Sequence, residues 1–202
     1  TSTNPPIYNE EKKVNVPQIL TGMTPIKFEM PTNSQKGEAV VTNKDDDNWY
    51  EYGETYETKR WANVKTQDGS MWVWIPRYEY KIDSTAKTID VNFIEGTSTA
   101  TTAGFTLHPA FSTDIENGGW SSDIAGFWIA KYPAGWQNGT NGTNSIGSNV
   151  EYSSATYASS GSNTSYAGST ASGQKMSLPE FKANTYAYNL ISVGDAYKLS
   201  QT

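Results

Sequence analysis

Apolar positions along the chain fall into short runs separated by polar turns, a pattern typical of β-strands. The run MWVWI (71–75) lies between Gly69 and Pro76 and predicts a buried strand, because it is short and is bounded by turn residues. The next residues, RYEYKID (77–83), alternate charged and aromatic side chains, as a half-exposed strand does. We therefore predict one strand whose burial changes at Pro76.

Similar runs predict further strands on both sides of this stretch. They are IKFEM (26–30), GEAVVTN (37–43), a hairpin within 49–64, IDVNFIEG (89–96) and AGFWIAKY (125–132). A helix is expected only from Val193 onward, where Asp195 lies near its predicted N-terminus.

Polar segments divide the chain into four parts. Residues 1–21 are polar and proline-rich and are expected to form an extended arm or linker, while residues 22–136 form the core. Residues 137–175 are dominated by Gly, Ser, Thr and Asn. They bury too little apolar area to offset a backbone entropy cost of about 1–2 kcal/mol per residue, so a surface insertion is predicted. Residues 176–202 are expected to hold a return strand and the start of a helix. Either the protein is natively shortened or processed after this helix, or a neighbouring subunit supplies the missing part.

Composition narrows the classes of function. The 202 residues carry a net charge of -6 and no clustered Lys/Arg run, which argues against nucleic acid as a partner. The absence of cysteine removes disulfides and thiolate chemistry. No apolar run approaches the roughly 20 residues that cross a bilayer, so no membrane insertion is predicted. Aromatic residues reach 13% while charged residues make up only 18%, which favours a β-rich, loop-rich surface protein.

Five sequence blocks occur together in one order. They are GMTPIKF (22–28), WYEY (49–52), RWANVKTQDGSMWVWIPRYEYKI (60–82), LHPAF (107–111) and GGWSSDIAGFWIAKYPAG (118–135). This series resembles a family of bacterial and phage proteins that includes tail-associated proteins and surface proteins with pilin-type leaders. It is more distantly similar to the formylglycine-generating, sulfatase-modifying enzymes.

The resemblance implies an α+β fold, irregular and rich in strands and loops, related to the C-type lectin fold. In such a fold, bulky aromatic rings fill the interior between large loops, each burying about 150–250 Å². The enzymes use cysteines to bind copper, and this chain has none, so their chemistry is not carried over to any residue. The family also continues with a further block after a segment like DAYKLSQT (195–202).

Reactive constellations are not evident in the sequence. His108 precedes a proline in an apolar context and is interpreted as a structural histidine bonded to backbone. The acidic runs KDDDN (44–48) and ENGG (116–119), with Asp123, are interpreted as solvated turns instead of calcium loops. We predict no catalytic residue, no metal site and no cofactor.

The binding hypothesis rests on aromatic residues near or within the polar insertion. Tyr152, Tyr157, Tyr166 and Trp136 are the predicted ligand- or receptor-binding residues, since tyrosine supplies contact area among adaptable polar side chains. The leading prediction is a non-enzymatic extracellular module of a phage tail, tail fibre or bacterial surface filament. Its predicted partners are copies of itself, other subunits, and a host-surface glycan or protein.

Two alternatives remain open. One is a carbohydrate-binding or adhesin module of a pilin-type surface protein, with Trp120, Trp128 or Trp136 stacking on sugar rings. The less favoured one is a divergent enzyme of the formylglycine-generating type. Phage and bacterial surface origins are not distinguished.

Overall fold

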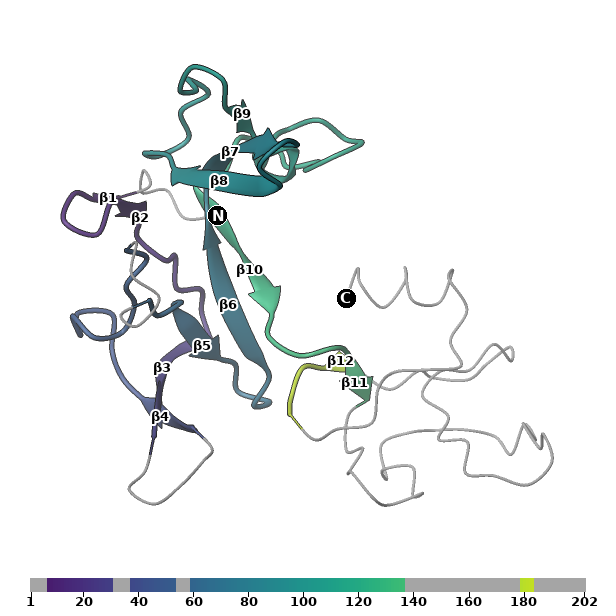
Figure 1. Cartoon of the computed structure of the whole chain (residues 1–202). Helices are drawn as coiled ribbons and strands as arrows, with labels where there is room; N and C mark the ends of the chain where they lie inside the picture. The colour runs from purple at the N-terminus through teal and green to yellow at the C-terminus, as the bar shows by residue number, and fades with distance from the viewer. Residues whose placement is uncertain (1–6, 31–36, 54–58, 137–178, 184–202) are drawn as a thin grey trace, which may run out of the picture. The chain divides into compact units, whose positions relative to one another are not determined.

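A computed structural model of the chain describes residues 7–30, 37–53, 59–136 and 179–183 (Figure 1). The strands are β1 (Tyr8–Asn9), β2 (Val14–Asn15), β3 (Thr24–Glu29), β4 (Glu38–Val41), β5 (Asn63–Lys65), β6 (Met71–Pro76), β7 (Tyr78–Asp83), β8 (Thr88–Phe93), β9 (Thr106–Leu107), β10 (Gly126–Ala130), β11 (Gly135–Trp136) and β12 (Pro179–Glu180). The one helix within the described ranges is the 3-10 turn η1 (Pro109–Phe111). A strand-rich, irregular architecture of antiparallel sheets is thereby confirmed.

The strands form four small sheets. The largest has the order β10-β6-β5-β3-β4, and a second has the order β8-β7-β9. Strand β3 pairs antiparallel with both neighbours, so that Ile26 lies opposite Val41 on one side and Asn63 on the other. The pairs β1-β2 and β11-β12 form two-stranded sheets.

The chain divides into two compact units. Unit 1 comprises residues 1–65 and 73–129, and unit 2 comprises residues 66–72 and 130–202. In unit 2, the backbone N–H of Met71 donates to the carbonyl of Phe181 at 2.9 Å, and the rings of Trp72 and Phe181 lie 4.8 Å apart. Phe181 directly follows β12, so this hydrogen bond and this ring contact join the end of β12 to residues 71–72.

Aromatic rings fill the interior of unit 1. Trp49, Trp74 and Phe111 are almost completely buried. Both tryptophans are hydrogen-bonded to backbone. The indole N–H of Trp49 donates to the carbonyl of Asn63, and that of Trp74 donates to the carbonyl of Asn15. Gly126 packs directly on Trp74, where an added Cβ would lie 2.3 Å from the ring. Glycine is required at this position of β10 because any side chain would displace the tryptophan.

The prediction of one strand across residues 71–83 is wrong. The chain forms two strands, β6 and β7, which belong to different sheets. Pro76 ends β6 because it has no backbone N–H to donate. At the junction, Arg77 is fully buried, and its N–H donates to the carbonyl of Ala125 at 2.8 Å. Burial of β6 is also uneven, with Trp74 and Pro76 buried and the remaining positions intermediate.

The N-terminal segment differs from the predicted arm outside the core. Val14 and Asn15 have no exposed surface, and β1 and β2 form a hairpin in which Tyr8 lies opposite Asn15. The cause is the Asn15 amide, which donates to the carbonyls of Ile94, Gly96 and Ala125 at 2.9–3.0 Å. A polar residue thus fastens this segment into the core, which polarity alone did not indicate.

Three other predictions have different outcomes. The predicted hairpin within 49–64 is reduced to a single bridge between Glu51 and Arg60, followed by β5. The insertion at 137–175 and the helix from Val193 lie outside the described residues. Within the described ranges, no helix has the length and apolar character needed to cross a membrane.

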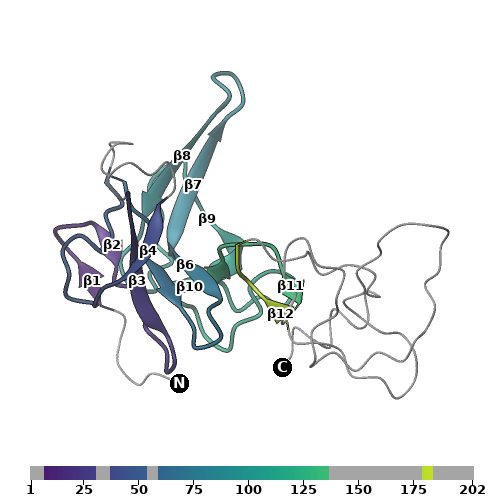
Figure 2. The ribbon, with the colours of Figure 1, turned by 90° about the horizontal axis from the view of Figure 1, so that it is seen from below.

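The β7-β8 hairpin is the most regular element of unit 1. Figure 2 shows it as a ribbon that extends from the strands around it. Its register is continuous from Tyr78 opposite Phe93 to Asp83 opposite Thr88. The turn is set by the Asp83 carboxylate, which accepts backbone N–H groups from Thr85 and Ala86 at 2.9 and 2.8 Å.

Candidate functional site

A groove with a volume of about 1360 Å³ opens in unit 1 beside the β7-β8 hairpin. The residues that line it are Glu11, Lys12, Lys13, Glu51, Tyr52, Gly53, Lys59, Trp61, Ile75, Tyr78, Glu79, Tyr80, Ile82, Ile89, Val91, Asn92, Phe93, Ile94, Glu95, Ala100, Thr101, Thr102 and His108. Aromatic and aliphatic side chains from distant parts of the sequence thus meet at one surface.

One wall is an apolar face of the hairpin. Side chains alternate between the two faces of a strand, so every second residue of β7 and β8 shares a face. The cross-strand pairs on this face are Tyr78 with Phe93, Tyr80 with Val91 and Ile82 with Ile89. We call these six residues the hairpin apolar face. Its outer half is exposed, with Ile82 at 62%, Ile89 at 65% and Val91 at 49%.

The opposite wall is anchored by Tyr52. Its hydroxyl donates to the carbonyl of Trp74 at 3.0 Å and accepts the backbone N–H of Ala62 at 3.1 Å. Its ring contacts Trp61 and Phe93 edge-on, at centroid distances of 5.0 and 5.4 Å. Burial raises the pKa of the Tyr52 hydroxyl well above its usual range, so it stays protonated at physiological pH. The Tyr52 side chain is thus held by two hydrogen bonds and uncharged.

Glu79 is a carboxylate held inside this aromatic region. It is 3% exposed and accepts the backbone N–H of Thr102 at 2.8 Å and the amide of Asn92 at 3.3 Å. Burial on its own raises the pKa of Glu79, but these hydrogen bonds outweigh burial, and the net shift is downward. Glu79 is thus a charged acceptor occupied in fastening residues 100–102 to β7.

His108 has the structural role predicted for it. Its Nδ1 accepts the backbone N–H of Ala110 at 3.3 Å, which caps the 3-10 turn η1. Its ring lies 4.9 Å from that of Tyr78 and 5.8 Å from that of Tyr80. Burial lowers the pKa of His108, so the neutral imidazole is favoured at neutral pH.

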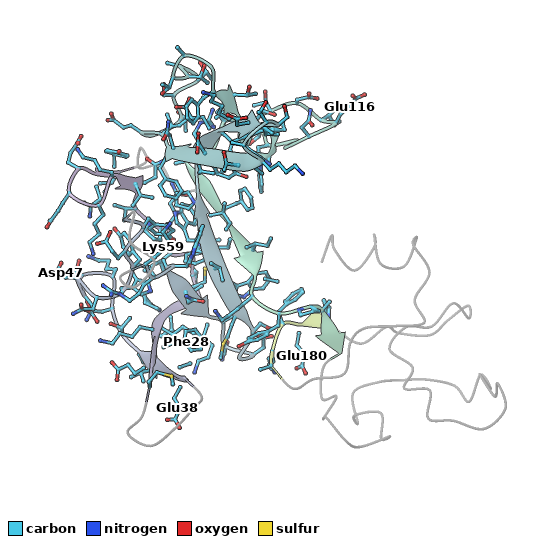
Figure 3. All side chains as sticks on the ribbon, in the orientation of Figure 1. Phe28, Glu38, Asp47, Lys59, Glu116 and Glu180 are labelled. Atoms are coloured by element: carbon cyan, nitrogen blue, oxygen red, sulfur yellow. The ribbon has the colours of Figure 1, made fainter. Side chains whose placement is uncertain are left out.

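The rim of the groove is charged with both signs. Lys12 bonds the carbonyls of Asp47 and Tyr50 at 2.7 and 3.0 Å, and its ammonium lies 4.6 Å from the centre of the Tyr50 ring. Lys59, labelled in Figure 3, contributes another positive charge, and Glu51 contributes a negative one. A mixed rim around an apolar wall is the usual surround of a protein-docking surface.

Arg77 lies behind the groove and was not singled out from the sequence. Its guanidinium donates to the carbonyls of Ser98, Phe111 and Ile124 at 2.9–3.3 Å. It also lies 3.5 Å from the Asp123 carboxylate, which is partly exposed. The guanidinium therefore ties residues 98, 111 and 124 to the junction between β6 and β7.

The predicted binding residues lie mostly outside this description. Tyr152, Tyr157 and Tyr166 are not among the described residues, and Trp136 is described only by its backbone in β11, opposite Pro179. They stay predictions.

The other two tryptophans considered for sugar stacking have different surroundings. Trp120 is 42% exposed, and its indole N–H donates to Ala110 at 2.8 Å. Trp128 is half-buried, stacks obliquely on Trp74 and donates to Gln18 at 2.7 Å. Of these two, Trp120 is the more accessible.

The acidic runs form hydrogen-bonded turns. Asp46 is paired with Lys27 at 3.1 Å and also bonds the Thr42 hydroxyl and the Asn48 N–H. Asp114 accepts the N–H of Glu116, whose side chain is labelled in Figure 3. Among the described residues, no three His, Cys, Asp or Glu side chains converge in a way that would hold a metal ion.

A weak sequence signal for the groove was available. The strict alternation of Tyr78, Tyr80 and Ile82, facing Ile89, Val91 and Phe93 across a short turn, predicts an apolar hairpin face. Nothing in the sequence indicates that the N-terminal residues 11–13 lie across from that hairpin, since this depends on the burial of Asn15.

Comparison of the chain with protein-family models, curated proteins and solved structures found no match. The family resemblance of the five sequence blocks therefore remains a prediction.

Proposed function

We propose that this chain is a non-enzymatic structural and recognition module of an extracellular assembly, a subunit of a phage tail or fibre or of a bacterial surface filament. The body proposed for it is lectin-like. The ordered sequence blocks support the setting, and the aromatic interior with short antiparallel sheets is compatible with that fold.

One observation carries the proposal, namely the exposed hairpin apolar face. Ile82, Ile89 and Val91 leave about half or more of their surface accessible in the single chain, side by side on one ribbon. A contiguous apolar patch rimmed by charges is typical of a surface covered by another protein. By contrast, the buried polar groups Arg77, Glu79 and Asn15 are bonded to backbone and hold the fold together.

Sedimentation across a concentration series tests this proposal. A subunit of an assembly associates as concentration rises. The substitution Ile82→Lys is expected to weaken that association, because it places a charge on the hairpin apolar face. Ile7→Lys is the matched control, because Ile7 is similarly exposed but does not line the groove. A wild-type chain that stays monomeric at the highest soluble concentration would refute the proposal.

A second candidate function is a carbohydrate-binding or adhesin module. It is favoured by the accessible rings of Trp61, at 41%, and Trp120, at 42%, because exposed aromatic rings stack on sugar faces. A glycan array tests it, with Trp120→Ala as the variant expected to lose binding and Trp128→Phe as the control that preserves a half-buried ring. Equal binding by wild type and Trp120→Ala would exclude Trp120 as the platform.

A further inference from the structure

Strand β8 is an edge strand whose outer side is unoccupied in the part of the chain that the structure describes. The sheet order is β8-β7-β9, and residues 88–92 of β8 are all exposed. Exposed edge strands with apolar side chains readily pair with another strand, unless charges or prolines protect them. Within β8, Asp90 is the only charged residue, and proline is absent.

The hydrogen-bond pattern shows which backbone groups are available at this edge. The N–H of Ile94 donates to the carbonyl of Arg77 at 3.0 Å, so these two residues form a hydrogen-bonded pair. Such pairs alternate along an antiparallel ladder. It follows that Asp90 and Asn92 bond toward β7, whereas the N–H and C=O groups of Ile89, Val91 and Phe93 point away from it.

Pairing of β8 with β8 of a second copy restricts the register. Residues whose backbone N–H and C=O groups point away from β7 must lie opposite residues of the same kind in the second copy. The allowed registers are therefore shifted from one another by two residues. A register centred on Asp90 places two aspartates opposite each other, and like charges directly opposite are destabilising. A register centred on Asn92 places Glu95 opposite Ile89 of the second copy. A register centred on Val91 avoids both faults.

The Val91 register is also complementary on both faces. On the apolar face, Val91 meets its own counterpart, and Ile89 meets Phe93 of the second copy. On the polar face, Asp90 lies opposite Asn92 of the second copy, an acceptor opposite an amide donor. About six inter-chain backbone hydrogen bonds form, since residues 89, 91 and 93 each belong to a hydrogen-bonded pair.

We propose that β8 is a self-association edge, at which two copies of this chain pair antiparallel about a two-fold axis through Val91 and join their hairpin apolar faces into one surface. This inference names the first contact of the assembly and so rests on the proposed function. Its occupant is a second copy because the favoured register is self-complementary, as an isologous interface requires.

Cysteine cross-linking tests the register. The full chain has no cysteine, so each single variant carries one thiol. In the Val91 register, the two Cα atoms at position 91 lie about 5.5 Å apart, within the range of a disulfide. Val91→Cys is expected to form a covalent dimer under mild oxidation at least about tenfold faster than Asp90→Cys. Ile89→Cys and Phe93→Cys should cross-link efficiently only when the two variants are mixed.

The outcomes of cross-linking are distinct. Faster cross-linking of Asp90→Cys than of Val91→Cys would overturn the Val91 register. Equally slow cross-linking of all variants would overturn the pairing of β8 edges altogether.

A backbone variant tests the same edge without oxidation. Val91→Pro removes one backbone donor, the outward N–H, which makes no bond to β7, and proline is accepted at such edge positions. Loss of the two central bonds is expected to raise the dimer dissociation constant about ten- to hundredfold. Val91→Thr keeps the N–H and the branched shape and is the matched control. Thermal unfolding of both variants at low concentration verifies that each one folds.

This test separates the inference from the proposed function. If the wild-type chain associates but Val91→Pro associates equally well, the β8 edge is wrong while the assembly role stands. If the wild-type chain is monomeric at every concentration, both fail. If Val91→Pro is monomeric and Val91→Thr dimeric, the inference holds.

Discussion

The junction between β6 and β7 and the outer half of the β7-β8 hairpin differ in burial, although they follow each other along the chain. At the junction, Arg77 and Phe111 are fully buried, and the polar atoms of Arg77 are bonded to carbonyls. In the outer hairpin, Ile82 and Ile89 lie opposite each other with more than half of their surface exposed. The junction is therefore expected to determine stability, and the outer hairpin to contribute mainly to association.

The largest effect is expected for Arg77→Met. Methionine fills similar volume but removes the guanidinium that donates to the carbonyls of Ser98, Phe111 and Ile124. We expect a loss of about 3–5 kcal/mol in the free energy of unfolding, because each hydrogen bond made by a charged donor contributes about 1.5–3 kcal/mol. Chemical denaturation measures it. Arg60→Met is the control at an exposed site and should change stability by less than about 0.5 kcal/mol.

Asn15→Ala should have the next largest effect. It removes the amide that bonds Ile94, Gly96 and Ala125, and also the oxygen that accepts the N–H of Gly96 at 2.7 Å. The expected loss is about 2–3 kcal/mol in urea unfolding. Asn92→Ala, on the exposed hairpin, should cost less than about 1 kcal/mol. Equal losses for the two variants would show that the N-terminal segment is not fastened to the core.

Tyr52→Phe isolates one hydroxyl of the groove wall. The hydroxyl joins the carbonyl of Trp74 to the N–H of Ala62, and both partners are buried with it. Its removal should cost about 1–2 kcal/mol with the ring contacts preserved. Tyr80→Phe, on the half-exposed hairpin, should stay within about 0.5 kcal/mol. A thermal shift of similar size for both variants would contradict the contrast between the buried Tyr52 wall and the hairpin.

The elements that were predictable from sequence are those with local signals. Strands β3, β4, β8 and β10 were each recognised within three residues, since period-2 alternation and flanking turn residues are local. The separation of β6 from β7 was missed because an apolar run does not show which sheet each half joins. Arg77 lies at that separation, and its partners lie 21–47 residues away along the chain.

The groove illustrates the same limit for function. Its hairpin wall follows from alternation within fifteen or so residues, whereas the opposite wall requires Tyr52 to reach the carbonyl of Trp74, 22 residues away. Long-range hydrogen bonds of single side chains decide this arrangement, and one sequence carries no direct record of them. The ligand-binding tyrosines were chosen by composition alone, and nothing in the described residues tests that choice.

Asp46 provides a pH-dependent contribution away from both regions. The Thr42 hydroxyl, the Asn48 N–H and Lys27 lower the pKa of Asp46 to about 2. Because the folded pKa is depressed, this stabilisation is present above the ordinary aspartate pKa of about 3.9 and is lost as pH falls toward 2. Thr42→Val removes the principal donor and should raise the pKa of Asp46, as measured by NMR titration. An unchanged pKa would show that the hydroxyl is not a partner.

The smallest expected effect on the isolated chain is that of Ile89→Thr. Both residues are β-branched and suit a strand, and Ile89 is 65% exposed, so little burial is lost. At concentrations where the protein is monomeric, stability should change by less than about 0.5 kcal/mol, whereas Ile26→Thr in the core should cost about 2–4 kcal/mol. At concentrations where copies associate, Ile89→Thr should become more costly, because pairing adds to the apparent stability of the wild type. A loss above about 1 kcal/mol in the monomer would instead mean that the hairpin apolar face is covered within its own chain.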